Sequence, residues 1–250
     1  MKDSVLEVCV DSLDAARAAE AGGSDRIELC AALSIGGVTP SLGLMTATIE
    51  ALSIPVHVMI RPRGGGFTRS ADEYDQMRKQ IGEAKRIGAA GVVLGILHPD
   101  GRVDVERSRA LVSLAYPMKV TFHRAFDEAP ELSEALEAVI QTGAHCLLTS
   151  GGEPDVLAGS DAIARLVAQA DGRLDVMAGG GVTLANLLKV VRRTGVSYLH
   201  GSLTGERKNG GNPKECAQNR QVALEANVRE AVRLFRAELS MREARKKILR

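Results

Sequence analysis

Residues 5–30 read VLEVCVDSLDAARAAEAGGSDRIELC: a strand-like run, an alanine-rich helical stretch, a pair of glycines and a second strand-like run. Gly22 follows the helical stretch, and a glycine just past a helix is a helix-stop signal. Two strands joined through a helix pair in parallel by a right-handed crossover. This stretch therefore predicts one complete βα unit and the strand that opens the next.

The same alternation continues along the chain. Further strand-like runs occupy residues 56–61, 91–95, 119–123, 145–150, 174–178 and 196–200. Helix-like segments separate them, and several end at a glycine (Gly88, Gly143, Gly195). Eight such units in a chain of 250 residues predict the α/β class and a (β/α)₈ TIM barrel. The alternative is an open doubly wound sheet, although no G-x-G-x-x-G motif follows the first strand.

No linker or shift in composition marks a second domain, so residues 1–250 are expected to form one, with a barrel core at about residues 4–239. From about Gln218 to Arg250 the spacing of apolar residues predicts one long helix, the eighth of the barrel with an extension. Its last part, about residues 240–250, is basic. That tail is interpreted as a solvated helix end, and a docking arm for a partner is the alternative.

Composition excludes several classes of function. The formal net charge is +1, aromatic residues make up 3% and Trp is absent, which argues against nucleic-acid binding. No apolar run is long enough to span a membrane, and the first residues do not resemble a signal peptide. The four cysteines lack the spacing of a disulfide framework. These features predict a cytoplasmic protein with free thiols.

Alternation along the strands separates an outer face from an inner one. Leu6, Val8 and Val10 share the apolar face that should pack on helices, which leaves Glu7 and Cys9 inward. The same reasoning points these side chains of later strands inward: Arg26, Glu28, Cys30, His57, Met59, Arg61, Thr121 and His123.

Such an interior is unusually polar, because ordinary barrel interiors hold Val, Ile and Leu. Buried charges need partners, so Glu7, Glu28, Arg61 and His123 form a functional cluster, or else Glu7 and Glu28 form a structural ion-pair network with Arg26 and Arg61. We expect Arg61 within hydrogen-bonding reach of Glu28 or Glu7, and His123 facing the same cavity.

Two thiols share the inner face of neighbouring strands. Cys9 and Cys30 each follow a Glu by two residues, and equal parity places them about 5 Å apart laterally. Met59 adds a thioether on the next strand, and such soft ligands suit Cu(I). Small buried hydrophobic side chains are the alternative interpretation of all three residues.

The carboxyl-terminal ends of the strands are rich in glycine and arginine. Barrels often bind phosphate between the loops after strands seven and eight, where backbone N–H groups approach an anion. Arginines after the third strand are suited to clamp a carboxylate or phosphate. The candidate anion-binding residues are Arg61, Arg63, Ser150, Gly151, Gly180, Gly181, Gly201 and Ser202. Tight turns and a solvated Arg63 are the alternatives.

Several long motifs resemble the copper homeostasis protein CutC family over about residues 4–205. They are LEVC at residues 6–9, DRIELC at 25–30, GGVTPS at 36–41, IRPRGG at 60–65, TFHRAFD at 121–127, LTSG at 148–151 and MAGGGV at 177–182. The sequence departs from the family pattern at Gly66, where Asp is usual, and at Arg69, where Tyr is common.

The resemblance implies a cytoplasmic barrel, often a homodimer, linked to copper tolerance. The cysteines that the family offers to Cu(I) correspond to Cys9 and Cys30. An alternative function is an enzyme acting on a small phosphorylated or carboxylated substrate at the same end of the barrel, with Glu7, Glu28 or His123 as acid or base. The expected partners are thus a copper ion or a small anionic ligand.

Overall fold

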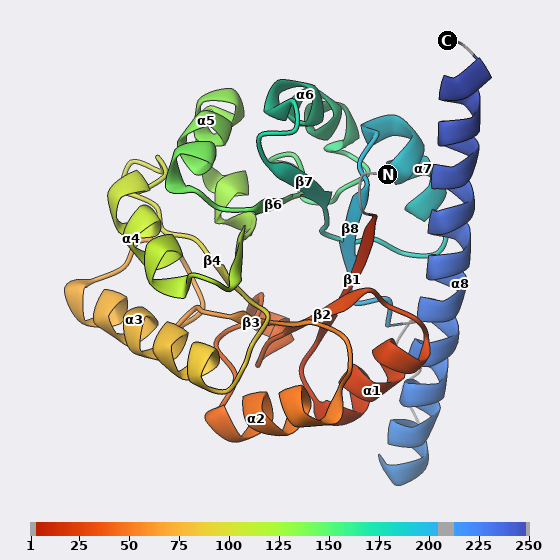
Figure 1. The fold of residues 1–250 in the computed structure, drawn as a ribbon, viewed down its shortest axis with the longest axis horizontal. Coiled ribbons are helices and arrows are strands. Elements are labelled where there is room, and N and C mark those ends of the chain that lie inside the picture. The colour runs from red at the N-terminus through yellow and green to blue at the C-terminus, as the bar shows by residue number, and fades with distance from the viewer. Residues whose placement is uncertain (1–3, 205–212, 249–250) are drawn as a thin grey trace.

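The computed structural model describes residues 4–204 and 213–248, which form the predicted (β/α)₈ barrel (Figure 1). The strands are β1 Val5–Val10, β2 Arg26–Leu29, β3 Val56–Met59, β4 Gly91–Leu94, β5 Lys119–Phe122, β6 Cys146–Thr149, β7 Asp175–Ala178 and β8 Tyr198–Gly201. The helices are α1 Leu13–Ala21, α2 Leu42–Ala51, α3 Ala71–Arg86, α4 Val105–Ala115, α5 Leu132–Thr142, α6 Ser160–Ala170, α7 Leu187–Thr194 and α8 Pro213–Ile248. Two short 3₁₀ turns, Leu33–Ile35 and Arg124–Glu128, follow β2 and β5.

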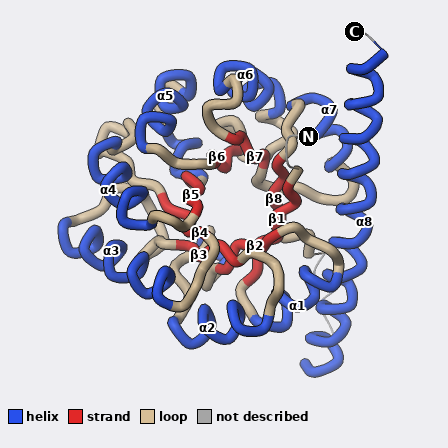
Figure 2. The backbone as a smooth tube through the Cα atoms, viewed as in Figure 1, coloured by secondary structure: helices blue, strands red, loops and turns tan. Residues whose placement is uncertain are grey.

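Parallel pairing runs through all eight strands in chain order, and β8 returns to pair with β1. Figure 2 shows the strands as a central ring with the helices outside it. Closure leaves no edge strand, so the sheet itself offers no free backbone to another chain.

The inward and outward faces are those that the alternation predicts. Leu6, Val8 and Val10 belong to the large apolar core between the strands and the helices. Cys9 and Cys30 belong instead to a separate small cluster inside the barrel, together with Met59 and Val93. The parity argument is therefore confirmed, and charged groups of the strands lie inside the ring.

Glycines on β4 and directly after it leave room for imidazole rings. A Cβ on Gly91 would lie 2.5 Å from the ring of His57 on β3, and one on Gly95 would lie 2.6 Å from the ring of His123. Both histidines are almost fully buried. Because Gly91 and Gly95 have no side chains, the rings of His57 and His123 have room to lie inside the barrel.

Helix α8 is longer than the other helices and extends past the barrel (Figure 1). It begins at Pro213, earlier than the apolar pattern predicts, and packs on α1 and α7. In the basic tail, Arg242 donates hydrogen bonds to the Gly195 carbonyl and to Ser197 Oγ, so this residue is attached to the barrel. Arg250, also part of the predicted basic tail, lies outside the described residues. Among the helices described, none is long and apolar enough to cross a membrane.

Substitution of Gly91 by Ala should destabilise the barrel by about 1–3 kcal/mol, because the new methyl group overlaps the buried ring of His57. Gly82→Ala is the matched control: Gly82 lies in α3 with no atom near its absent Cβ, and Ala should raise stability there by about 1 kcal/mol. Urea unfolding of both variants measures the difference. Equal effects of the two substitutions would contradict the role of Gly91.

Candidate functional site

Strand register places Glu7 between two basic residues. Glu7 on β1 is in register with Arg26 on β2 and with His200 on β8. Arg26 Nε donates to Glu7 Oε2 at 2.5 Å, and His200 Nδ1 lies 2.7 Å from Glu7 Oε1. Glu7 is fully buried, so both carboxylate oxygens depend on these partners.

The contacts among Glu7, Arg26 and His200 determine the charge that each side chain carries. Burial raises the pKa of Glu7, but the charge of Arg26 and the hydrogen bond with His200 outweigh it and hold that pKa well below its usual range. Burial lowers the pKa of His200, yet the carboxylates and the Cys9 sulfur around it raise that pKa well above its usual value. At neutral pH the group therefore holds one carboxylate, one guanidinium and one imidazolium.

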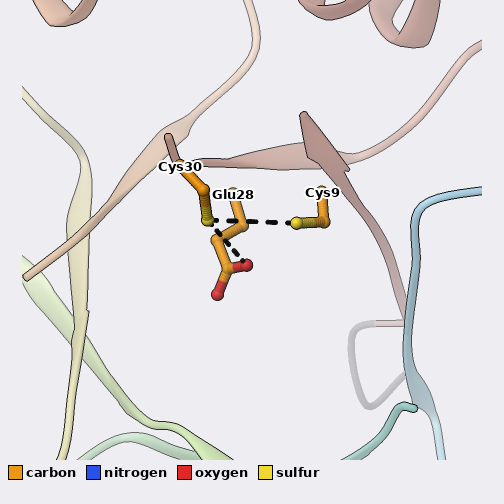
Figure 3. A group of neighbouring side chains, drawn as sticks. All are labelled: Cys9, Glu28 and Cys30. Atoms are coloured by element: carbon orange, nitrogen blue, oxygen red, sulfur yellow. Dashed lines mark hydrogen bonds between the residues drawn. The ribbon is translucent and has the colours of Figure 1, made fainter. Parts of the chain in front are cut away.

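The next inward positions hold Cys9 on β1 and Glu28 on β2, and Cys30 follows just past the end of β2. Cys9 is in register with Glu28, and Cys30 follows Glu28 by two residues. The two sulfurs lie 3.9 Å apart, and Cys30 Sγ lies 3.3 Å from Glu28 Oε2. Figure 3 shows the three side chains converging inside the ring of strands. His200 Nε2 lies 3.9 Å from Glu28 Oε2, which joins this group to Glu7.

The thiols differ in acidity. The hydrogen bond from Cys30 exceeds the opposing effect of burial and, with His200 nearby, lowers the pKa of Cys9 to about 5. The same hydrogen bond, together with burial, raises the pKa of Cys30 well above its usual value. Burial and the charge of Cys9 raise the pKa of Glu28. One negative charge, centred on Cys9, thus lies beside the His200 imidazolium.

Among the described residues, two sets of side chains have ligand atoms close enough to hold a metal ion. In the first, Cys9, Glu28 and Cys30 offer two sulfurs and an oxygen, all within 4.8 Å of one another. In the second, Glu7, Glu28 and His200 offer oxygen and nitrogen at the same spacing. Glu7 already has two partners, so the first set is the better candidate.

A cavity of about 290 Å³ opens at the carboxyl-terminal end of the strands, above these groups. The predicted site residues on its wall are Cys9, Glu28, Arg61, His123, Gly180, Gly181, Gly201 and Ser202. Met59 and His200 also line it. A larger hollow of about 380 Å³ lies near His98 and Pro130, on the outside of the barrel, and none of the predicted site residues lines it.

His123 faces this cavity as expected, but the prediction that Arg61 pairs with Glu28 or Glu7 is wrong. Arg61 Nη1 donates to the carbonyls of Ile35 and Gly37, and Nη2 donates to that of Gly65. Strand β3 ends at Met59, so Arg61 lies past the strand and its guanidinium is held by the neighbouring loops. Arg26 is the arginine that pairs with Glu7.

The remaining predicted residues lie away from the cavity wall. Glu7 lies below it, and Arg63 pairs with Glu73 on the outer side of its loop. Ser150 accepts a hydrogen bond from Arg124 Nη2 at 2.7 Å and donates to Asp127. Gly151 packs against the backbone of Gly159, where a Cβ would lie 2.5 Å from a carbonyl oxygen.

Two residues of the site were not among the sequence predictions. His200 contacts both glutamates, and Arg124 lines the cavity while paired with Asp127 at 2.8 Å. A signal for His200 was available: Leu199 is outward, so alternation on the last strand places His200 inward.

Replacing Arg26 by Met should cost about 3–5 kcal/mol of stability at neutral pH, because it leaves the buried Glu7 carboxylate with one partner. Because folding lowers the pKa of Glu7, this carboxylate contributes stability above about pH 4.5 and loses it as the pH falls. Urea unfolding between pH 3 and 7 should show that the difference in stability between the parent and the Arg26→Met variant becomes smaller as the pH falls. The double variant Arg26→Met/Glu7→Gln should recover much of the stability, and a double variant as unstable as the single one would contradict this.

The low pKa of Cys9 predicts alkylation by iodoacetamide with a midpoint near pH 5, because the thiolate is the reacting form. Cys146, with a pKa raised to about 12 by burial, should stay unlabelled at neutral pH. A Cys216→Ser background simplifies the mass spectra. His200→Gln should move the midpoint upward, and a midpoint near 9 in the parent protein would refute the assignment.

Comparisons with known proteins agree with this architecture and cover the residues of the site. Residues 4–205 match the CutC family. A human protein named copper homeostasis protein cutC homolog is 45% identical over 206 residues, which cover 82% of this chain and 76% of its own. A CutC family protein of Chromobacterium violaceum is 46% identical over 204 residues, covering 82% and 83% of the two chains.

Solved structures lead to the same result. The crystal structure of CutC from Streptococcus agalactiae matches with a TM-score of 0.75 and 34% identity, over 80% of this chain and 100% of that one. Thiamine phosphate pyrophosphorylase from Pyrococcus furiosus, at 14% identity and a TM-score of 0.61, covers 94% of this chain and 96% of its own and shares the fold alone. The resemblance found in the sequence motifs is confirmed, and the chain belongs to the CutC family.

Proposed function

We propose that this protein binds Cu(I) at the barrel mouth, with Cys9 and Cys30 as its ligands and a role in copper handling. The observation that carries the proposal is the pair of inward sulfurs, 3.9 Å apart, with Cys9 on the cavity wall. Thiolates are soft ligands of the kind that select Cu(I). Met59 lies in the same buried cluster and offers a thioether.

The spacing of the sulfurs fits one shared ion. Disulfide sulfurs lie about 2.05 Å apart, so these are separate thiols. A metal–thiolate bond of about 2.3 Å, as for zinc, lets one ion join sulfurs up to about 4.6 Å apart. The observed separation falls within that limit and requires little rearrangement of the strands.

Electrostatics also favour a cuprous ion here. A metal ligand must be the thiolate, and the lowered pKa of Cys9 means that this sulfur is ionised at neutral pH. Two thiolates and one Cu(I) carry a net charge of −1. The His200 imidazolium, hydrogen-bonded to Glu7 and close to Glu28, supplies the matching positive charge.

The names of relatives support the same function, since the human protein is named for copper homeostasis. A second candidate is an enzyme that moves protons on a small anionic substrate. Glu28, with its raised pKa, and His123 line one cavity, which favours this alternative. The homodimer, the cytoplasmic location and the single domain stay predictions.

Competition for Cu(I) against a strong chelator under anaerobic conditions tests the copper site. The Cys9→Ser/Cys30→Ser variant should lose at least 100-fold in affinity, because hydroxyls are poor ligands for this soft ion. Cys146→Ser is the matched control: Cys146 is also buried in the barrel but belongs to a different cluster with Leu148 and Met177, and should bind as the parent does. Equal affinity of the double variant and the parent would disprove the assignment.

A further inference from the structure

Arg61 is a buried cation without a carboxylate partner. Its side chain lines the mouth cavity, yet the residue is only 5% exposed. Its Nη atoms bind three carbonyls, and its Nε has no partner. No carboxylate among the described residues lies within 4.0 Å of its guanidinium. A buried charge is costly unless it is paired, so this wall of the cavity has unused affinity for an anion.

A second arginine of the same loop adds to this positive charge. Arg69 is 5% exposed, and its Nε and Nη2 are buried without partners. Among the described residues, it donates to the carbonyls of Gly66 and Thr68. In contrast, Arg63 of the same loop is neutralised by Glu73. Among the described residues, two of the three arginines in this loop therefore form no ion pair within 4.0 Å, and Glu128 and Glu73 act on them only from farther away.

His123 provides a neutral donor beside these charges. Its Nδ1 accepts the N–H of Ala125 at 3.2 Å, so the ring proton lies on Nε2. Burial and the charges of Arg61 and Arg69 lower the pKa of His123 to about 3, which keeps the ring neutral. His123 lines the cavity, and its Nε2 is buried without a hydrogen-bond partner among the described residues. An N–H donor in this position needs an acceptor that the described residues do not provide.

Across the cavity, the loop after β7 contributes backbone donors. Gly180 and Gly181 line the cavity with φ of 103° and 77°, in the left-handed region that glycine tolerates. Their carbonyls accept bonds from Val156 and Asn186. Neither N–H has a hydrogen-bond partner among residues 4–204 and 213–248. Successive unpaired N–H groups of this kind form an anion-binding backbone.

We propose that the barrel mouth holds a binding site for the oxyanion group, carboxylate or phosphate, of a small organic molecule, between Arg61 and His123 on one side and the N–H groups of Gly180 and Gly181 on the other. A cavity of about 290 Å³ suits a ligand at the small end of the usual range. The site goes beyond copper binding, since none of these four residues belongs to the group of Cys9, Glu28 and Cys30.

The direct test is a titration of metal-free, ¹⁵N-labelled protein with inorganic phosphate and, separately, acetate, with chloride at equal ionic strength as the reference. The amide signals of Gly180 and Gly181 should shift saturably with at least one oxyanion and stay unchanged with chloride. The tighter of the two identifies the oxyanion. Equal shifts with chloride, or saturable shifts confined to other residues, would overturn the site without any substitution.

Variants assign the site to its residues. Arg61→Gln should weaken oxyanion binding at least 10-fold, and Arg61→Lys should retain more affinity because it keeps the charge. Arg63→Gln, the same change at the neighbouring arginine paired with Glu73, should alter affinity less than twofold. Unaltered affinity in a folded Arg61→Gln variant would overturn the proposal.

The Cys9→Ser/Cys30→Ser variant separates the anion site from the copper site. It should bind the oxyanion at least as tightly as the parent does, because the Cys9 thiolate, a negative charge on the same cavity wall, is absent. Loss of oxyanion binding in this variant would show that the anion site depends on the cysteines and would overturn the proposal of an anion site. A parent protein that fails to bind copper would contradict the copper site but not the anion site.

Discussion

The buried carboxylate of Glu7 is the interaction on which the interior of this barrel depends. It lies on β1, the strand that pairs with both β2 and β8, and it binds a basic residue from each neighbour. Removing a carboxylate from water is unfavourable, and two direct partners offset that penalty. The same contacts therefore join the first two strands and close the ring at β8.

The charges of Glu7 and His200 also affect the thiols that lie above them. Glu7 holds His200 as an imidazolium, and the other face of that ring approaches Glu28 and Cys9. The imidazolium helps to stabilise the Cys9 thiolate, while burial and the neighbouring Cys9 raise the pKa values of Glu28 and Cys30. A pair of cysteines that would otherwise be inert buried thiols becomes a partly ionised pair, with Cys9 on the wall of the mouth cavity and Cys30 buried behind it.

The sequence was sufficient for the fold and for one half of the site. Strand alternation is local, so the outward Leu6 and Val8 predict the inward Glu7 and Cys9 without any knowledge of distant residues. The position of Arg61 could not be predicted in this way, because alternation ends with β3 and the loop carbonyls that hold its guanidinium come from three separate positions. The hydrogen bond between Glu7 and His200 joins residues 193 apart, and register across the closing strands is visible only in three dimensions.

That separation also imposes an order on how the site is completed during synthesis. The two cysteines lie on the first two strands, but the imidazolium that balances them comes from the last strand. A nascent chain that has not yet formed β8 holds the thiols without their counter-charge, and the carboxylate of Glu7 without one of its partners. The hydrogen bond from Cys30 needs only the first two strands, whereas the contribution of His200 to the low pKa of Cys9 arises only when the ring closes, which links the chemistry of the mouth to completion of the whole barrel.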